Sequence, residues 1–103
     1  MSTITPLALL SAVLPVGSSS EGWTLHEGEG ERRYSQEIAF ERPFSSTPVV
    51  QVGVVGIDAS KDHNLRLRLR AENISSSGFT IVVETWLHSQ LWSVDLSWLA
   101  IGV

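Results

Sequence analysis

The residues in this sequence that could bind a ligand are grouped around a tryptophan with an unexpected position. From residue 79 to residue 86 apolar residues alternate with more polar ones, which predicts a β-strand with one apolar face. The alternation places Trp86 on the more polar face, just before a turn that carries His88 and Gln90. A large aromatic side chain beside hydrogen-bonding groups on such a face is typical of a binding surface.

The chemistry that suits these residues is the recognition of a sugar. A sugar presents C–H patches that contact aromatic rings, and hydroxyls that bind carboxylate or guanidinium groups through charge-assisted hydrogen bonds. Residues of the right types are Trp86, Trp92, Arg66, His88 and the segment 26–31, in which glycine alternates with glutamate. We call residues 26–31 the acidic loop.

Each feature also has an ordinary structural explanation. The acidic loop could simply be a solvated surface loop. Arg68 and Arg70 could form a solvated row or an ion-pair ladder with Glu72 and Glu84.

The other tryptophans differ in what their positions predict. Trp98 lies in the middle of an apolar face and is expected in the core. Trp23 could be in the core or could anchor the N-terminal segment. Strict alternation places Trp92 on the core face with Val94, but its position at the start of a strand would also let it reach the rim.

Catalytic, metal and cofactor sites have little support in the sequence. His26, His63 and His88 lack metal-ligand spacing, no nucleotide-binding or nucleophile motif is present, and no cofactor is expected. The three glutamates of the acidic loop are clustered, but nothing marks one as a proton donor. The absence of cysteine excludes disulfides and is compatible with a reducing compartment. The net charge of −4 argues against general nucleic-acid binding.

The elements that must position these residues are short strands. Alternation or β-branched composition predicts strands at 34–41, 49–57, 65–70, 79–86 and the segment ending at Ala100. The segment 49–57 is almost entirely apolar and is expected to be a central strand. In 65–70 three leucines are expected to face the core and three arginines the opposite side. With no sustained helical period, the chain is predicted to be an all-β antiparallel sandwich.

The N-terminal residues 1–20 are expected to be an apolar segment and a linker, ahead of a domain at 21–103. The segment 7–16 is too short to span a bilayer, so no membrane insertion is expected. It could be a retained packing or oligomer-contact segment, or an export signal without the usual positive end.

Short motifs distributed along the chain resemble those of the H-type lectin domain family from about Gly22 to Ile101. They are Ile38-Ala39-Phe40, Pro48-Val49-Val50, Ile57-Asp58, Asn64-Leu65-Arg66, Ser77-Gly78-Phe79, Thr85-Trp86 and Ser97-Trp98-Leu99-Ala100-Ile101. The resemblance implies a six-stranded sandwich that assembles as a trimer or a dimer of trimers. It further implies metal-free binding of N-acetylgalactosamine or galactose in a cleft between neighbouring protomers.

Carried over by position, the resemblance implies roles for individual residues. Arg66 would bind sugar hydroxyls, Trp86 would form an aromatic wall, and Trp92 would contact the ligand through its ring or indole N–H. The family's loop aspartate falls nearest to Glu29, with Gly28 supplying backbone groups, although Glu27 or Glu31 could serve instead.

The chain also departs from the family pattern in ways that affect the expected function. In the family pattern a histidine directly follows the tryptophan, but Leu87 occupies that position here. His88 comes one position later, where a regular strand would point its side chain to the opposite face. The alternative is therefore a structural or assembly domain that has lost sugar binding. A glycosidase is a more distant alternative that would need a paired-carboxylate cleft.

Overall fold

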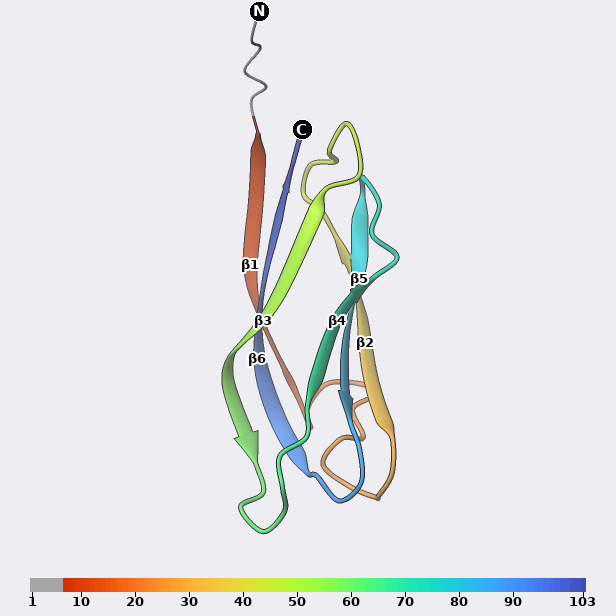
Figure 1. The fold of residues 1–103 in the computed structure, drawn as a ribbon, viewed down its shortest axis with the longest axis vertical. Helices are drawn as coiled ribbons and strands as arrows, with labels where there is room; N and C mark the ends of the chain where they lie inside the picture. The colour runs from red at the N-terminus through yellow and green to blue at the C-terminus, as the bar shows by residue number, and fades with distance from the viewer. Residues whose placement is uncertain (1–6) are drawn as a thin grey trace, which may run out of the picture.

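The protein is a six-stranded antiparallel β-sandwich, as the sequence predicts (Figure 1). The structure is a computed structural model that describes residues 7–103. Its strands are β1 (Ala8–Gly17), β2 (Arg32–Ala39), β3 (Val49–Ala59), β4 (Arg68–Glu72), β5 (Gly78–Thr85) and β6 (Leu91–Gly102). Within the described residues there is no helix, and so none that could cross a membrane.

The strands form two layers of three. Sheet A has the order β1-β6-β3 and sheet B the order β2-β5-β4, so β6 and β5 are the central strands. All the pairings are antiparallel. The two sheets pack against each other through their inner faces, and the layers stand side by side in Figure 1.

The core lies between the sheets and follows the predicted alternation. In β6 the side chains of Val94, Leu96, Trp98 and Ala100 are buried, whereas those of the intervening residues are not. Trp98 is a core residue, as expected, and its ring packs edge-on against Phe79 with centroids 5.5 Å apart. Such apolar burial supplies most of the driving force for folding.

The segment 49–57 is not a central strand, so this prediction is wrong. It belongs to β3, which pairs only with β6 among the described strands and lies at the edge of sheet A. Its apolar side chains include Val49, Val55 and Ile57, all of which are exposed. Apolar composition indicates that a strand face avoids water, but it does not say whether the covering surface belongs to the same chain.

The strand predicted at 65–70 begins later than expected, and Leu65 is 53% exposed instead of facing the core. Both backbone groups of Arg66 bind side-chain hydroxyls, because its N–H donates to Ser89 and its carbonyl accepts from Thr85. These bonds replace a strand ladder at this position, so β4 starts only at Arg68. Leu67 and Leu69 do pack against the core.

The N-terminal segment forms strand β1. It pairs with β6 along its whole length, from Ala8 opposite Gly102 to Gly17 opposite Ser93. The first part of the segment, residues 1–6, lies outside the described residues. An apolar face that alternates along the segment packs Leu10, Leu14 and Val16 toward the core.

Candidate functional site

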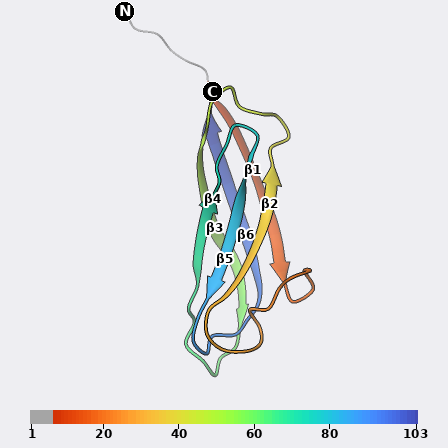
Figure 2. The ribbon, with the colours of Figure 1, turned by 90° about the vertical axis from the view of Figure 1, so that its right-hand side faces the viewer.

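All the residues predicted to bind sugar lie at or next to one end of the sandwich. The antiparallel order brings three loops to this end: residues 18–31 between β1 and β2, 60–67 between β3 and β4, and 86–90 between β5 and β6. Two views show these loops gathered at the end opposite the C-terminus (Figures 1 and 2). We call residues 86–90 the tryptophan turn.

The tryptophan turn reverses the chain immediately after β5. Leu87 has a φ of 57°, the left-handed conformation that costs an L-residue about 1–2 kcal/mol. The turn therefore does not continue the alternation of the strand, and the expectation that His88 points away from the site does not apply. Instead His88 Nδ1 lies 3.3 Å from Glu29 Oε1 of the acidic loop.

Two buried hydroxyls fasten Arg66 to the tryptophan turn. Ser89 Oγ accepts a hydrogen bond from the Arg66 N–H at 2.9 Å and donates one to the carbonyl of Asn64. Thr85 Oγ1 donates to the Arg66 carbonyl at 2.6 Å. Because the backbone of Arg66 is held on both sides, the origin of its side chain is fixed relative to the turn. Among residues 7–103 the Arg66 guanidinium has no carboxylate partner.

The cation that faces the Trp86 ring is Arg68. Its guanidinium carbon lies 5.1 Å from the ring centroid, within the range of a cation–π interaction. Arg70, two residues further on, instead pairs with Glu84 and with Glu72 at 3.3 Å. The ion-pair ladder expected from the sequence is thus present for Arg70 but not for Arg68.

The acidic loop depends on its glycines for its shape. Gly28 and Gly30 have φ values of 73° and 80°, a region that other residues adopt with strain. Of its glutamates, Glu29 is the one that pairs with His88 of the tryptophan turn, while Glu27 Oε1 lies 4.0 Å from His26 Nε2.

Trp92 lies at the rim of the end of the sandwich that carries the three loops. Its side chain is 44% exposed, while its neighbour Leu91 is fully buried. A register shift between Asp58 and Ala59, opposite the start of β6, breaks the strict alternation there. The ring of Trp92 lies 5.0 Å from that of His26, and among residues 7–103 no ring contact joins it to Trp86.

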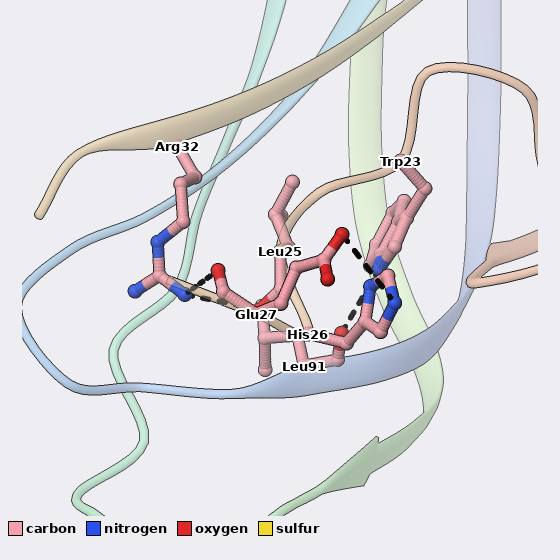
Figure 3. Close-up of polar contacts among 6 residues, drawn as sticks. All are labelled: Trp23, Leu25, His26, Glu27, Arg32 and Leu91. Carbon is pink, nitrogen blue, oxygen red and sulfur yellow. Dashed lines mark hydrogen bonds and ion pairs between the residues drawn. The ribbon is translucent and has the colours of Figure 1, made fainter. Parts of the chain in front are cut away.

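Trp23 anchors the loop that leads to the site. Its ring is buried against Tyr34, with centroids 5.2 Å apart, and its Nε1 donates to the carbonyl of Leu91 at 3.0 Å. The Leu91 N–H in turn donates to the carbonyl of Leu25 at 2.9 Å. Figure 3 shows Trp23, Leu25 and Leu91 together with Arg32, which also contacts the acidic loop.

Arg32 is the residue that the sequence interpretation missed most clearly. Its guanidinium donates to the carbonyls of Glu27, Gly30 and Leu87 at 2.9–3.0 Å, and to that of Leu25 at 3.4 Å. The only local signal was an arginine directly after a glycine-rich loop, whose carbonyls have no regular backbone partners. For Arg68 the sequence offers a solvated row or an ion-pair ladder, because it cannot show that the side chain covers the Trp86 ring.

The structure therefore brings only some of the predicted residues into direct contact. Glu29 pairs with His88, and Gly28 precedes Glu29 in the same loop. Arg66 is tied to the tryptophan turn through its backbone, and Trp92 packs on the loop through His26. No group of three or more His, Asp or Glu residues within residues 7–103 is arranged to hold a metal ion.

Comparison of the sequence with those of known proteins identifies a family and several relatives. The family model for the H-type lectin domain matches residues 35–101. The chain is 39% identical over 83 residues to "ATP synthase subunits region ORF 7" of Fuscovulum blasticum, covering 81% of this chain and 72% of that protein. It is 28% identical over 79 residues to discoidin-2 of Dictyostelium discoideum, covering 76% of this chain but only 31% of that longer protein.

Solved structures show the same fold. The chain matches recombinant discoidin II of Dictyostelium discoideum with a TM-score of 0.82 and 22% identity, over 98% of this chain and 39% of that one. It matches the tailspike protein gp49 from Pseudomonas phage LKA1 with a TM-score of 0.66 and 20% identity, over 92% and 15% of the two chains. At these identities the likeness concerns the fold alone.

Proposed function

The chain belongs to the H-type lectin domain family, and we propose that it binds galactose-type glycans, including N-acetylgalactosamine, without a metal. Family and fold identify it as a carbohydrate-binding lectin and point to a binding protein rather than an enzyme. The proposal concerns the finer properties: the sugar, the residues that contact it and the number of sites in the assembly.

The observation that carries this proposal is the pairing of Glu29 with His88 of the tryptophan turn, the turn to which Arg66 is tied through its backbone. A carboxylate, an imidazole and an unpaired guanidinium can each bind a sugar hydroxyl, and such charge-assisted bonds are stronger than neutral ones. Trp86 begins the same turn, and the part of its ring that Arg68 does not cover would offer an apolar surface for the C–H face of the sugar. The charged groups would determine which arrangement of sugar hydroxyls is bound, and the ring would determine which face of the sugar packs against the protein.

We propose further that the cleft is shared between protomers. Trp86 packs with Arg68 of sheet B, whereas Trp92 packs with His26, and no ring contact between residues 7–103 links the two tryptophans. Two separate aromatic groups are consistent with two half-sites, each completed by a neighbouring protomer. Repeated weak sites in one assembly would then supply avidity.

The outer face of sheet A is the surface that we propose for the assembly. Leu9 and Val49 lie on either side of Ile101 in one cross-strand row, and Leu9 and Val13 are more than 60% exposed. A shallow groove follows this face, lined by Gln51 and by small or apolar residues that include Ser11, Gly53 and Leu99. Contiguous apolar surface of this kind is typical of a subunit interface, and we expect a trimer or a dimer of trimers.

A glycan array tests the proposed function. We expect the fluorescently tagged protein to bind terminal galactose or N-acetylgalactosamine in the presence of EDTA, and to release them when the free sugar is added. An oligomer of the expected mass that binds no glycan would instead identify an assembly domain. Turnover of a chromogenic galactoside would contradict the assignment as a binding protein.

A further inference from the structure

We propose that Arg32 is a positioning residue that fastens the acidic loop to the tryptophan turn, and that sugar affinity depends on this fastening. Nothing in the family resemblance assigns Arg32 a role. The inference rests on the proposed function, because it concerns the same site, but the joint itself can be measured without any sugar.

The contacts of Arg32 join two segments that are distant in sequence. Nε donates to the Gly30 carbonyl at 3.0 Å, and Nη1 donates to the Glu27 carbonyl at 2.9 Å. Nη2 donates to the carbonyl of Leu87, 55 residues away, at 2.9 Å. Figure 3 shows the guanidinium directed at the loop carbonyls from the start of β2.

The joint is reinforced by a second hydrogen bond at the same oxygen. The Gly30 N–H donates to the Leu87 carbonyl at 2.9 Å, so this oxygen accepts from both the loop and Arg32. Leu87 is also the residue in the left-handed conformation. The guanidinium thus holds the carbonyl of the one residue that turns the chain toward His88.

The geometry places Glu29 between two held points. Its neighbours Glu27 and Gly30 are both fixed by Arg32, and its partner His88 directly follows Leu87. Removal of the guanidinium would leave the Gly30 N–H bond to the Leu87 carbonyl unsupported, so the loop and the turn would separate more easily. Sugar binding would then have to order both segments, and that cost would appear as lost affinity.

A lysine cannot replace this arginine in the joint. The guanidinium presents donors from three nitrogens in a rigid fork, and all three nitrogens are used here. A lysine ammonium keeps the charge but donates from one nitrogen, so it cannot reach carbonyls on opposite sides of the fork. Arg32→Lys therefore breaks the guanidinium bonds of the joint while preserving the charge near Glu29, and the Gly30 N–H bond to the Leu87 carbonyl must then hold the joint without them.

The test compares Arg32→Lys and Arg32→Gln with Arg33→Gln. Arg33 is the matched control, because it is the next residue and its described side-chain partner is Glu72, which lies on β4. Amide hydrogen exchange is measured at Gly30, which donates to Leu87, and at Leu91, which donates to Leu25. Affinity for the best glycan of the array is measured on the same proteins, together with their thermal unfolding.

We expect both Arg32 variants to exchange the Gly30 amide at least about tenfold faster, with the Leu91 amide little changed. We expect affinity to fall about tenfold or more, and Arg33→Gln to change neither quantity. If Arg32 acts through Glu29, the affinity losses of Arg32→Lys and Glu29→Gln will be non-additive in the double variant.

Several outcomes would overturn the inference. Unchanged exchange at Gly30 would show that Arg32 does not hold the joint. Faster exchange with full affinity, or strictly additive losses, would show that the joint does not serve the site. Loss of the fold in both Arg32 variants would assign the residue to global stability instead. A wild-type protein that binds no glycan would refute the proposed function, while the exchange data would still report on the joint.

Discussion

Three arginines spaced two residues apart show how little the residue type alone decides. Arg66, Arg68 and Arg70 form one sequence pattern, but each has different surroundings in the structure. Arg70 is neutralised by carboxylates of sheet B, and Arg68 lies over the Trp86 ring. Arg66, whose backbone is tied to the tryptophan turn, keeps a guanidinium without a carboxylate partner within residues 7–103. A group that is fixed at its origin and unpaired at its end is suited to bind a ligand.

Substitution of Arg66 by alanine should abolish detectable glycan binding without unfolding the domain. The loss of a charged hydrogen-bonding group costs about 1.5–3 kcal/mol, which is about tenfold or more in affinity, and single-site binding of a monosaccharide is expected to be weak already. The measurement is glycan-array signal together with thermal unfolding. Arg42→Ala, at the opposite end of the sandwich, is the control for the change in charge. Undiminished array binding by Arg66→Ala would remove this residue from the site.

At the scale of elements, the site depends on joints between loops rather than on the strands themselves. The segment ahead of β4 is held by the hydroxyls of Thr85 and Ser89, and the acidic loop is held by Arg32. Both hydroxyl residues are almost completely buried. Buried polar groups require hydrogen-bond partners. Here the partners are backbone groups of the loop, so the bond that satisfies each hydroxyl also fixes the loop.

Ser89→Ala should weaken both the fold and the position of Arg66. The change leaves the partly buried Arg66 N–H and the carbonyl of the exposed Asn64 without their partner. An unpaired polar group costs about 1–3 kcal/mol when fully buried, so the loss here is expected at about 1 kcal/mol. Urea unfolding measures the loss of stability, and the array measures the accompanying loss of binding. Ser76→Ala, in the loop at the other end of the sandwich, provides a control. A stability equal to that of the wild type would show that water replaces the hydroxyl and that the joint is dispensable.

At the scale of the whole molecule, the two edge strands of sheet A carry most of the exposed apolar residues found on the described strands. β1 contributes Leu9 and Val13, and β3 contributes Val49. Because residues 8–17 form a paired strand, deletion of the N-terminal segment would remove part of the sandwich and would not isolate an assembly contact. Point substitutions on the outer face are therefore the cleaner way to examine assembly.

Val13→Lys should dissociate the oligomer while leaving the protomer folded. Val13 is 65% exposed in a single protomer, so a lysine is tolerated there, but a charge within a subunit interface would have to be desolvated. The mass is measured by light scattering. Ser35→Lys introduces the same charge at an exposed position on β2 of sheet B and should leave the mass unchanged. An oligomer that survives Val13→Lys would exclude the outer face of sheet A as the interface.

Much of the fold could be predicted from local pattern. Alternation correctly predicted one apolar inner face for β5 and the core position of Trp98, because the side-chain period of a strand is a local property. Combined with short motifs, it also identified the family. Composition alone misplaced β3 as a central strand, since apolar residues look the same whether they face a core or a partner.

The sequence by itself determined which types of residue are available for the site, but not how they are arranged. The sequence supplied an aromatic residue, a guanidinium and an acidic loop, which together indicate a sugar-binding chemistry. Only the tertiary structure decided that Glu29 faces His88, that Arg68 covers Trp86, and that Arg32 joins the loop to Leu87. These facts depend on a left-handed turn and on contacts between residues that are far apart in the sequence, 55 positions in the case of Arg32 and Leu87. No local periodicity contains them, because they arise only when the two sheets pack and bring their loops to one end.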